Sequence, residues 1–144
     1  MLKKTITYNG FDGKEYTEDF WFGLTKGDLI EMEVATPGGM QSYLERIRQT
    51  QDIRGVLEMF KHLIMTSYGQ KSPAGKRLVR SKALSEEFAQ TEAYDNLLME
   101  IFSDENAAAA FVKGILPQDI AAQAEAQLAT MEKNGELPAI TPIN

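Results

Sequence analysis

The sequence predicts an α+β fold that is predominantly α-helical, with a small N-terminal β-hairpin packed on about six helices. Residues 3–22 have an extended, aromatic-rich pattern, whereas apolar residues recur at helical spacing through residues 25–117. The chain has 144 residues, 43% hydrophobic and 25% charged, which is enough for one domain with its own core. We therefore expect one domain over 1–117, followed by a C-terminal helix and a flexible tail over 118–144.

The hairpin prediction depends on two extended runs separated by strong turn residues. A TITY run precedes NGFDG, which contains two favoured turn pairs, and the second strand ends in Phe20, Trp21 and Phe22. Side chains alternate along a strand, so Phe20 and Phe22 share one face and Trp21 lies on the other. If helices cover only one face, Trp21 is exposed or contacts a partner. The alternative is a hairpin covered on both faces.

Three helices are expected after the hairpin. Thr25 can cap the first, with Asp28 in its first turn near the positive end of the helix dipole. The second covers 41–49 and the third, with the clearest pattern, covers 52–66. We expect the third helix to end near Gly69, with this glycine in a left-handed conformation. Its apolar stripe consists of Ile53, Val56, Leu57, Phe60, Leu63 and Ile64.

Three more helices are expected in the second half of the chain, beginning at Thr91, at Asp104 and at residue 118. The last of them has a narrow apolar stripe. This stripe is narrower than is usual for a helix that packs on the protein's own core, and its width suits pairing with another helix. Its members are Ile120, Ala124, Leu128 and Met131.

One basic segment stands out in an acidic chain. The net charge is −6, from 15 basic and 21 acidic residues, yet no acid occurs between Tyr68 and Ser85. An acidic surface repels nucleic acid, and no aromatic residues are interleaved with these bases. We therefore favour contact with the chain's own acids or with an acidic protein, and nucleic-acid binding is the alternative. The bases are Lys71, Lys76, Arg77, Arg80 and Lys82.

The run GQKSPAGKR within this segment is similar to a phosphate-binding loop but departs from its pattern. Such a loop reads G-x-x-x-x-G-K-[ST]. Here five residues separate Gly69 from Gly75, and Arg77 stands where the hydroxyl residue belongs. Pro73 also lacks the amide N–H that would face a phosphate. We expect a reverse turn around Pro73 that joins two short extended pieces, and no nucleotide binding.

No group of residues predicts catalysis, a metal site or a cofactor. The absence of cysteine excludes disulfides and thiolate chemistry. His62 is the only histidine and has no companions for catalysis or metal binding, so we expect it to be structural or exposed. The stretch MLKKTITYNG has no long apolar run after its lysines, so we do not expect it to be a signal peptide, and no apolar run is long enough to span a bilayer. These features are typical of an intracellular protein that is not an enzyme.

Several spaced motifs together resemble the tail assembly chaperones of long-tailed bacteriophages that infect Gram-positive hosts. The resemblance covers about residues 3–117, and the remainder is unspecific. The motifs are LTKxDL at 24–29, YGxKSxxGKR at 68–77, SxxF at 85–88, TxAY at 91–94 and FVxGILP at 111–117.

The resemblance implies a protein that binds the long, helical, hydrophobic tape measure protein in the cytoplasm of the infected or lysogenic host. It would keep this client soluble until tail-tube subunits polymerise around it, and would be absent from the mature virion. The major tail protein is a further candidate partner. A standard interface buries only about 800 Å² per partner, so several self-associating copies would be needed for so long a client. We expect these contacts to be made by Trp21, by the C-terminal stripe and by four bases of the basic segment, Lys71, Lys76, Arg77 and Arg80.

Overall fold

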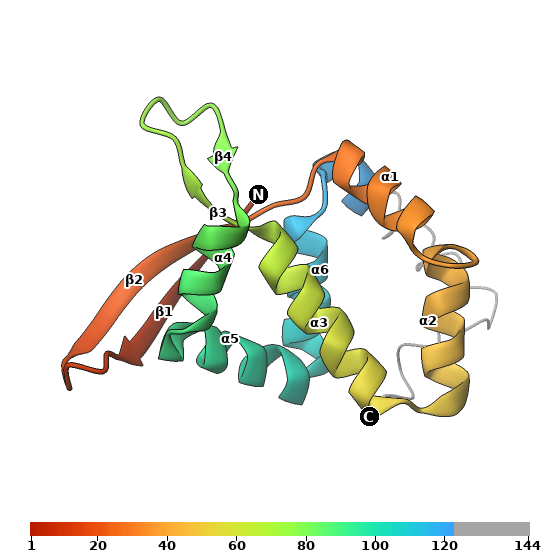
Figure 1. Cartoon of the computed structure of the whole chain (residues 1–144), viewed down its shortest axis with the longest axis horizontal. Helices are drawn as coiled ribbons and strands as arrows, with labels where there is room; N and C mark the ends of the chain where they lie inside the picture. Colours follow the sequence, from red (N-terminus) through yellow and green to blue (C-terminus); the bar gives the residue numbers. More distant parts are fainter. Residues whose placement is uncertain (123–144) are drawn as a thin grey trace.

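The computed structural model describes residues 1–122, and the statements below apply to this part of the chain. It contains a four-stranded antiparallel sheet and six helices (Figure 1), which confirms an α+β fold rich in helix. The elements are β1 (Leu2–Asn9), β2 (Glu15–Phe22), α1 (Lys26–Ala35), α2 (Gly39–Thr50), α3 (Ile53–Ser67), β3 (Tyr68–Lys71), β4 (Leu78–Val79), α4 (Lys82–Ala89), α5 (Glu92–Ser103) and α6 (Glu105–Ile115).

The sheet is a long two-stranded ribbon with a short second hairpin attached at one end. β1 and β2 pair over their whole length, from Leu2↔Phe22 to Asn9↔Glu15. β3 meets β2 only at Trp21 and Phe22, and then turns away to pair with β4 (Figure 1). The predicted N-terminal hairpin is confirmed, but the sheet has four strands because the two extended pieces around Pro73 join it.

The end of α3 differs from the expectation. The helix passes directly into β3, and Gly69 is a strand residue without a positive φ, so the predicted left-handed cap is wrong. Gly69 has a different role. A methyl group built on it would lie 2.7 Å from Leu78 Cγ and 2.7 Å from the Val79 carbonyl oxygen. Only a residue without Cβ allows β4 to approach this closely.

Aromatic residues from distant segments form the centre of the core. Phe22 is fully buried, with its ring centroid 5.5 Å from that of Phe111 in α6. The rings of Tyr68 and Phe88 stack at 4.4 Å. Aromatic pairs of this kind contribute energy beyond the area they bury. Phe88 belongs to α4, a helix that the sequence analysis did not predict, and α4 therefore supplies a central core residue.

Helices cover only one face of the sheet. Ile6 and Phe22 are buried and Phe20 is half-buried, all on the face that meets the helices. On the other face Thr5, Thr7 and Asp19 are exposed, as are the other residues at alternate positions except Trp21. We call this second surface the open face of the sheet.

The apolar stripe predicted for α3 faces the core along most of its length. Val56, Phe60, Leu63 and Ile64 are buried and Leu57 is half-buried. Ile53 is the exception, since it is 70% exposed at the first turn of the helix. There α3 leaves the core and connects to α2, so Ile53 has nothing to pack against.

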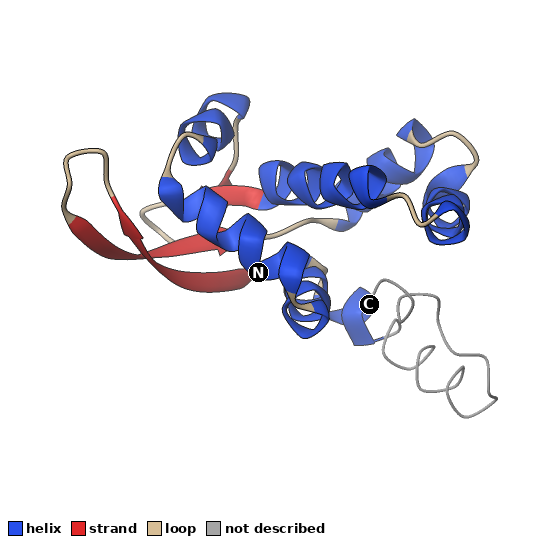
Figure 2. Ribbon diagram, turned by 90° about the horizontal axis from the view of Figure 1, so that it is seen from below, coloured by secondary structure: helices blue, strands red, loops and turns tan. Residues whose placement is uncertain are grey.

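The helices α1 and α2 form an arm on the opposite side of the molecule from the ribbon (Figures 1 and 2). The predicted cap is present as a capping box, because the Thr25 side chain accepts from the Asp28 amide and the Asp28 side chain accepts from the Thr25 amide. α1 has no buried residue. Leu29 and Met32 pack on the edge of the core, whereas Ile30 and Val34 are exposed.

A last helical segment begins after α6 and is described for residues 118–122. Asp119 forms an ion pair of 2.6 Å with Lys26 at the start of α1. Ile120 is half-buried. The other members of the predicted C-terminal stripe, Ala124, Leu128 and Met131, lie outside the described residues.

Replacing Phe60 by alanine is predicted to lower the free energy of unfolding by about 3–5 kcal/mol, because Phe60 is buried and its removal leaves a cavity. Urea denaturation followed by circular dichroism measures the change. Ile53→Ala, on the same helix but exposed, is the matched control and should cost less than about 1 kcal/mol. Equal losses from the two substitutions would contradict the core described above.

Candidate functional site

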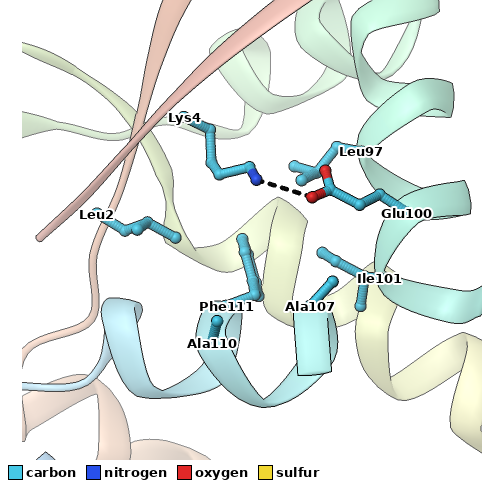
Figure 3. A pocket seen from close by; sticks show the side chains of 8 residues that line it. All are labelled: Leu2, Lys4, Leu97, Glu100, Ile101, Ala107, Ala110 and Phe111. Atoms are coloured by element: carbon cyan, nitrogen blue, oxygen red, sulfur yellow. Dashed lines mark hydrogen bonds and ion pairs between the residues drawn. The ribbon is translucent and has the colours of Figure 1, made fainter. Parts of the chain in front are cut away.

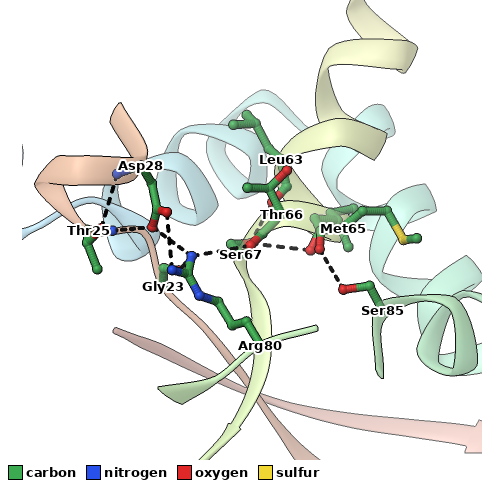
Figure 4. A network of polar contacts seen from close by, with 10 residues as sticks. Gly23, Thr25, Asp28, Leu63, Met65, Thr66, Ser67, Arg80 and Ser85 are labelled. Carbon is green, nitrogen blue, oxygen red and sulfur yellow. Dashed lines mark hydrogen bonds and ion pairs between the residues drawn. The ribbon is translucent and has the colours of Figure 1, made fainter. Parts of the chain in front are cut away.

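Arg80 fixes the junction at which the two hairpins and the helices meet. Its guanidinium donates to both carboxylate oxygens of Asp28, at 2.7 and 3.1 Å, and to the carbonyl oxygens of Gly23 and Thr66 (Figure 4). These groups belong to the β2–α1 connection, α1 and the last turn of α3. One side chain from the segment after β4 thus joins three other segments of the chain. Arg80 is therefore an internal residue, and we do not assign it to a partner surface.

Asp28 is held in its charged form by this junction. Burial alone would raise its pKa, but hydrogen bonds from Arg80 and Thr25 outweigh burial and leave the pKa below its ordinary value of 3.8. Serines complete the network, since Ser67 donates to the Leu63 carbonyl and Ser85 donates to the Met65 carbonyl (Figure 4). The last turn of α3 is therefore tied to α4 as well as to Arg80.

The open face of the sheet carries Trp21 next to the junction. Trp21 is half-buried and is on the side opposite Phe20 and Phe22, as strand alternation predicts. Its register partner on β3 is Gly69, which has no side chain to cover the indole. The Lys71 ammonium group lies 5.8 Å from the centre of the ring, within the range of a cation–π contact. The structure thus brings together two residues that the sequence analysis treated separately.

Leu78 and Met1 extend this surface and were not anticipated. A Cβ built on Gly23 would lie 3.3 Å from the Leu78 side chain and 3.6 Å from the Met1 backbone, which places both residues beside the end of β2. Met1 is largely exposed and Leu78 is half-buried. In the sequence, only the alternation of side chains along the short extended piece after the basic turn could have indicated that Leu78 lies on this surface. We call Met1, Trp21, Lys71 and Leu78 the tryptophan patch.

Lys76 and Arg77 lie beyond the patch, at the tip of the β3–β4 hairpin, and are exposed. Together with Lys71 they have no ion pair to any residue of the described chain. Three amides of the turn donate to internal acceptors, so they do not face outward to a phosphate as the amides of a nucleotide loop do. Gly75 N–H donates to the Ser72 carbonyl, Ser72 N–H to the Arg77 carbonyl and Arg77 N–H to Ser72 Oγ.

The family model of the phage tail assembly chaperones matches residues 1–141 of the chain. The chain belongs to this family. Searches of curated proteins and of solved structures found no significant match.

One surface hollow of this tail assembly chaperone, of about 130 Å³, lies between β1 and helices α5 and α6 (Figure 3). The Lys4–Glu100 ion pair, 3.1 Å long, spans its mouth over a lining of leucine, isoleucine, phenylalanine and alanine. The lysine and the glutamate neutralise each other, so the hollow offers a ligand only apolar contact.

No other group in the described chaperone suggests a ligand site. His62 is exposed on α3. Within residues 1–122 no three histidine, cysteine or acidic side chains are grouped to hold a metal ion. Among the helices of that same part, none combines the length and apolarity needed to cross a membrane. We therefore take the tryptophan patch and the basic hairpin tip as the candidate surfaces for binding a partner.

Substituting Asp28 by asparagine is predicted to flatten the acid dependence of stability. The folded pKa of Asp28 lies below its unfolded value, so its contribution is complete above the unfolded pKa and is lost as pH falls through both values. Urea denaturation between about pH 5 and pH 3 should therefore show a steeper loss for the wild type than for Asp28→Asn. Glu31→Gln, an exposed acid of the same helix, should retain the wild-type slope, and an Asp28→Asn slope equal to the wild type would refute the assignment.

Proposed function

We propose that this chaperone binds the tape measure protein of its phage and keeps it soluble in the host cytoplasm until the tail tube forms around it. The observation that carries the proposal is the tryptophan patch, within a chain that belongs to the tail assembly chaperone family. A half-buried indole on a helix-free sheet face offers apolar area that the protein's own core does not use.

The chemistry of the patch suits a client with repeated apolar helical segments. Trp21 and Leu78 offer flat and branched apolar contacts, neither of which requires a particular partner sequence. The Lys71 ammonium next to the indole can meet an acidic or polar residue at the edge of the client's apolar stripe. Contacts of this kind bind many related segments, as a chaperone for a long client requires.

The proposal includes several copies per client, and a contact with the major tail protein after delivery. A client longer than 144 residues exceeds what one copy can shield, so neighbouring copies that also touch one another gain avidity. The protein would act as a non-enzymatic, cofactor-free factor that leaves before the virion matures. Residues 118–144, which include the stripe of Ile120, Ala124, Leu128 and Met131, are a second proposed client surface.

Nucleic-acid binding by the basic hairpin is the alternative function. It is favoured only by the exposed Lys71, Lys76 and Arg77, which form no ion pair within residues 1–122. These three charges belong to a chain of net charge −6. Salt-dependent binding to labelled DNA, abolished by Lys76→Ala with Arg77→Ala, would support this alternative over a protein client.

Replacing Trp21 by serine is predicted to reduce the soluble fraction of co-expressed tape measure protein severalfold, because the indole supplies the main apolar contact of the patch. The soluble and pelleted client are quantified by gel after lysis. Phe11→Ser is the matched control, since Phe11 is an aromatic residue of the same ribbon, 97% exposed at its turn, and should leave client solubility unchanged.

Circular dichroism melting must first show that both variants are folded. A Trp21→Ser variant that is folded and still solubilises the client would exclude the patch as the binding surface. A client that remains insoluble with the wild-type chaperone would overturn the proposed function itself.

A further inference from the structure

The two outer edges of the β1–β2 ribbon differ in how far other parts of the chain cover them. The edge of β1 is covered by α5, where Glu92 accepts from the Asn9 amide at 3.3 Å and Asn96 donates to the Thr7 carbonyl at 3.1 Å. These contacts also show which residues of β1 direct their backbone groups toward β2 and which direct them away from it. The backbone groups of Thr7 and Asn9 point away from β2, so the even-numbered residues of β1 bond across the pair.

The same alternation of backbone direction leaves three residues of β2 with unpaired backbone groups. The register pairs even residues of β1 with even residues of β2, so Glu15, Thr17 and Asp19 direct their N–H and C=O groups to the far side. β3 could occupy that side but reaches only Trp21 and Phe22 before it turns away. No other described backbone group bonds to these residues, and all three are exposed. We call Glu15–Asp19 the free edge.

The charge of the free edge restricts what can pair with it. Its sequence, EYTED, has three acids and no base. Glu18 accepts from the Tyr8 hydroxyl and Asp19 from the Thr5 hydroxyl, and neither carboxylate forms an ion pair with another described residue. Two free edges paired with each other would oppose acid to acid, which is destabilising. An incoming strand should instead carry lysine or arginine.

The chain itself contains an edge strand next to such bases. β4 (Leu78–Val79) has no base of its own, but it is an edge of the sheet and directly follows the exposed Lys76 and Arg77 at the hairpin tip. Ser72 N–H donates to the Arg77 carbonyl, so by alternation the backbone groups of Leu78 point outward from the hairpin. One molecule therefore has an acidic stretch of β2 with unpaired backbone groups, and a short edge at β4 where Leu78 directs its backbone groups outward beside two exposed bases.

We propose that the free edge binds the β3–β4 hairpin of a second copy of this chain, which extends the sheet from copy to copy. The contact joins two different surfaces, so it repeats head to tail and does not close into a two-fold dimer. Charge complementarity and main-chain bonds act at the same place, and one contact satisfies both edges. The inference deepens the self-association within the proposed function and is independent of client binding.

Charge reversal tests this contact on the full chain without client. The edge variant carries Glu15→Lys with Asp19→Lys, and the hairpin variant carries Lys76→Glu with Arg77→Glu. Each should weaken self-association by roughly tenfold or more in sedimentation velocity, because opposed charges become alike. A chain with all four substitutions, or a mixture of the two variants, should associate again.

Two controls separate the contact from general effects. Glu86→Lys with Glu87→Lys changes the net charge by the same amount as the edge variant, on the exposed surface of α4, and should leave association unchanged. Thr17→Pro removes an N–H that faces outward, so it should block association while the ribbon remains folded, as melting by circular dichroism would show. Recovery in the four-site chain excludes misfolding as the cause of the single-set losses.

Carbodiimide cross-linking of a mixture of ¹⁵N-labelled and unlabelled chaperone locates the contact. Mixed-isotope cross-links between Lys71 or Lys76 of one copy and Glu15, Glu18 or Asp19 of another are expected. A strictly monomeric protein, or association unaffected by either charge reversal, would overturn the inference. A monomeric chaperone that still solubilises its client would overturn it too, but would leave the proposed function in place.

Discussion

The bidentate pairing of Arg80 with Asp28 is the contact on which the arrangement of the two hairpins depends. It joins the start of α1 to the segment that follows β4, and the same guanidinium reaches the last turn of α3. Both side chains are shielded from solvent over most of their surface. Removing either partner would leave the other charge partly buried and uncompensated, which is costlier than losing an exposed ion pair.

This junction explains how a short hairpin comes to extend beyond the core. Arg80 fixes the end of β4, and Gly69 allows β4 to lie close against β3. The β3–β4 hairpin therefore pairs with only the end of β2 and then diverges from it. The indole of Trp21 remains partly exposed and the edge of Glu15–Asp19 remains unpaired as a result. The surface that we assign to the client and the edge that we assign to a second copy thus have one structural origin.

Local patterns in the sequence predicted the elements whose causes are local. The Thr25 capping box, the sides taken by Phe22 and Trp21, and the buried stripe of α3 follow from residues a few positions apart. Ile53 was predicted wrongly because periodicity cannot show where a helix leaves the core. Three of the four predicted residues of the C-terminal stripe lie beyond residue 122, so that prediction stays untested.

Features that depend on distant contacts could not be predicted. Gly69 looked like a helix terminator, yet its role is set by Leu78 and Val79 of a strand that it meets only in the fold. The bases of the basic segment were expected to face the chain's own acids or an acidic protein, but the sequence could not show that Arg80 pairs with Asp28, 52 positions earlier. The cation–π pair of Lys71 and Trp21 likewise needs the pairing of β2 with β3.

The intrinsic fluorescence of Trp21 tests the central claim, that the tryptophan patch contacts the client, most directly. Trp21 is the only tryptophan, so a titration with a tape measure segment that lacks tryptophan reports on this one side chain. A saturable blue shift of the emission, with weaker quenching by acrylamide, is the result that this account predicts. A complex that forms by sedimentation while the emission and the quenching stay unchanged would contradict it.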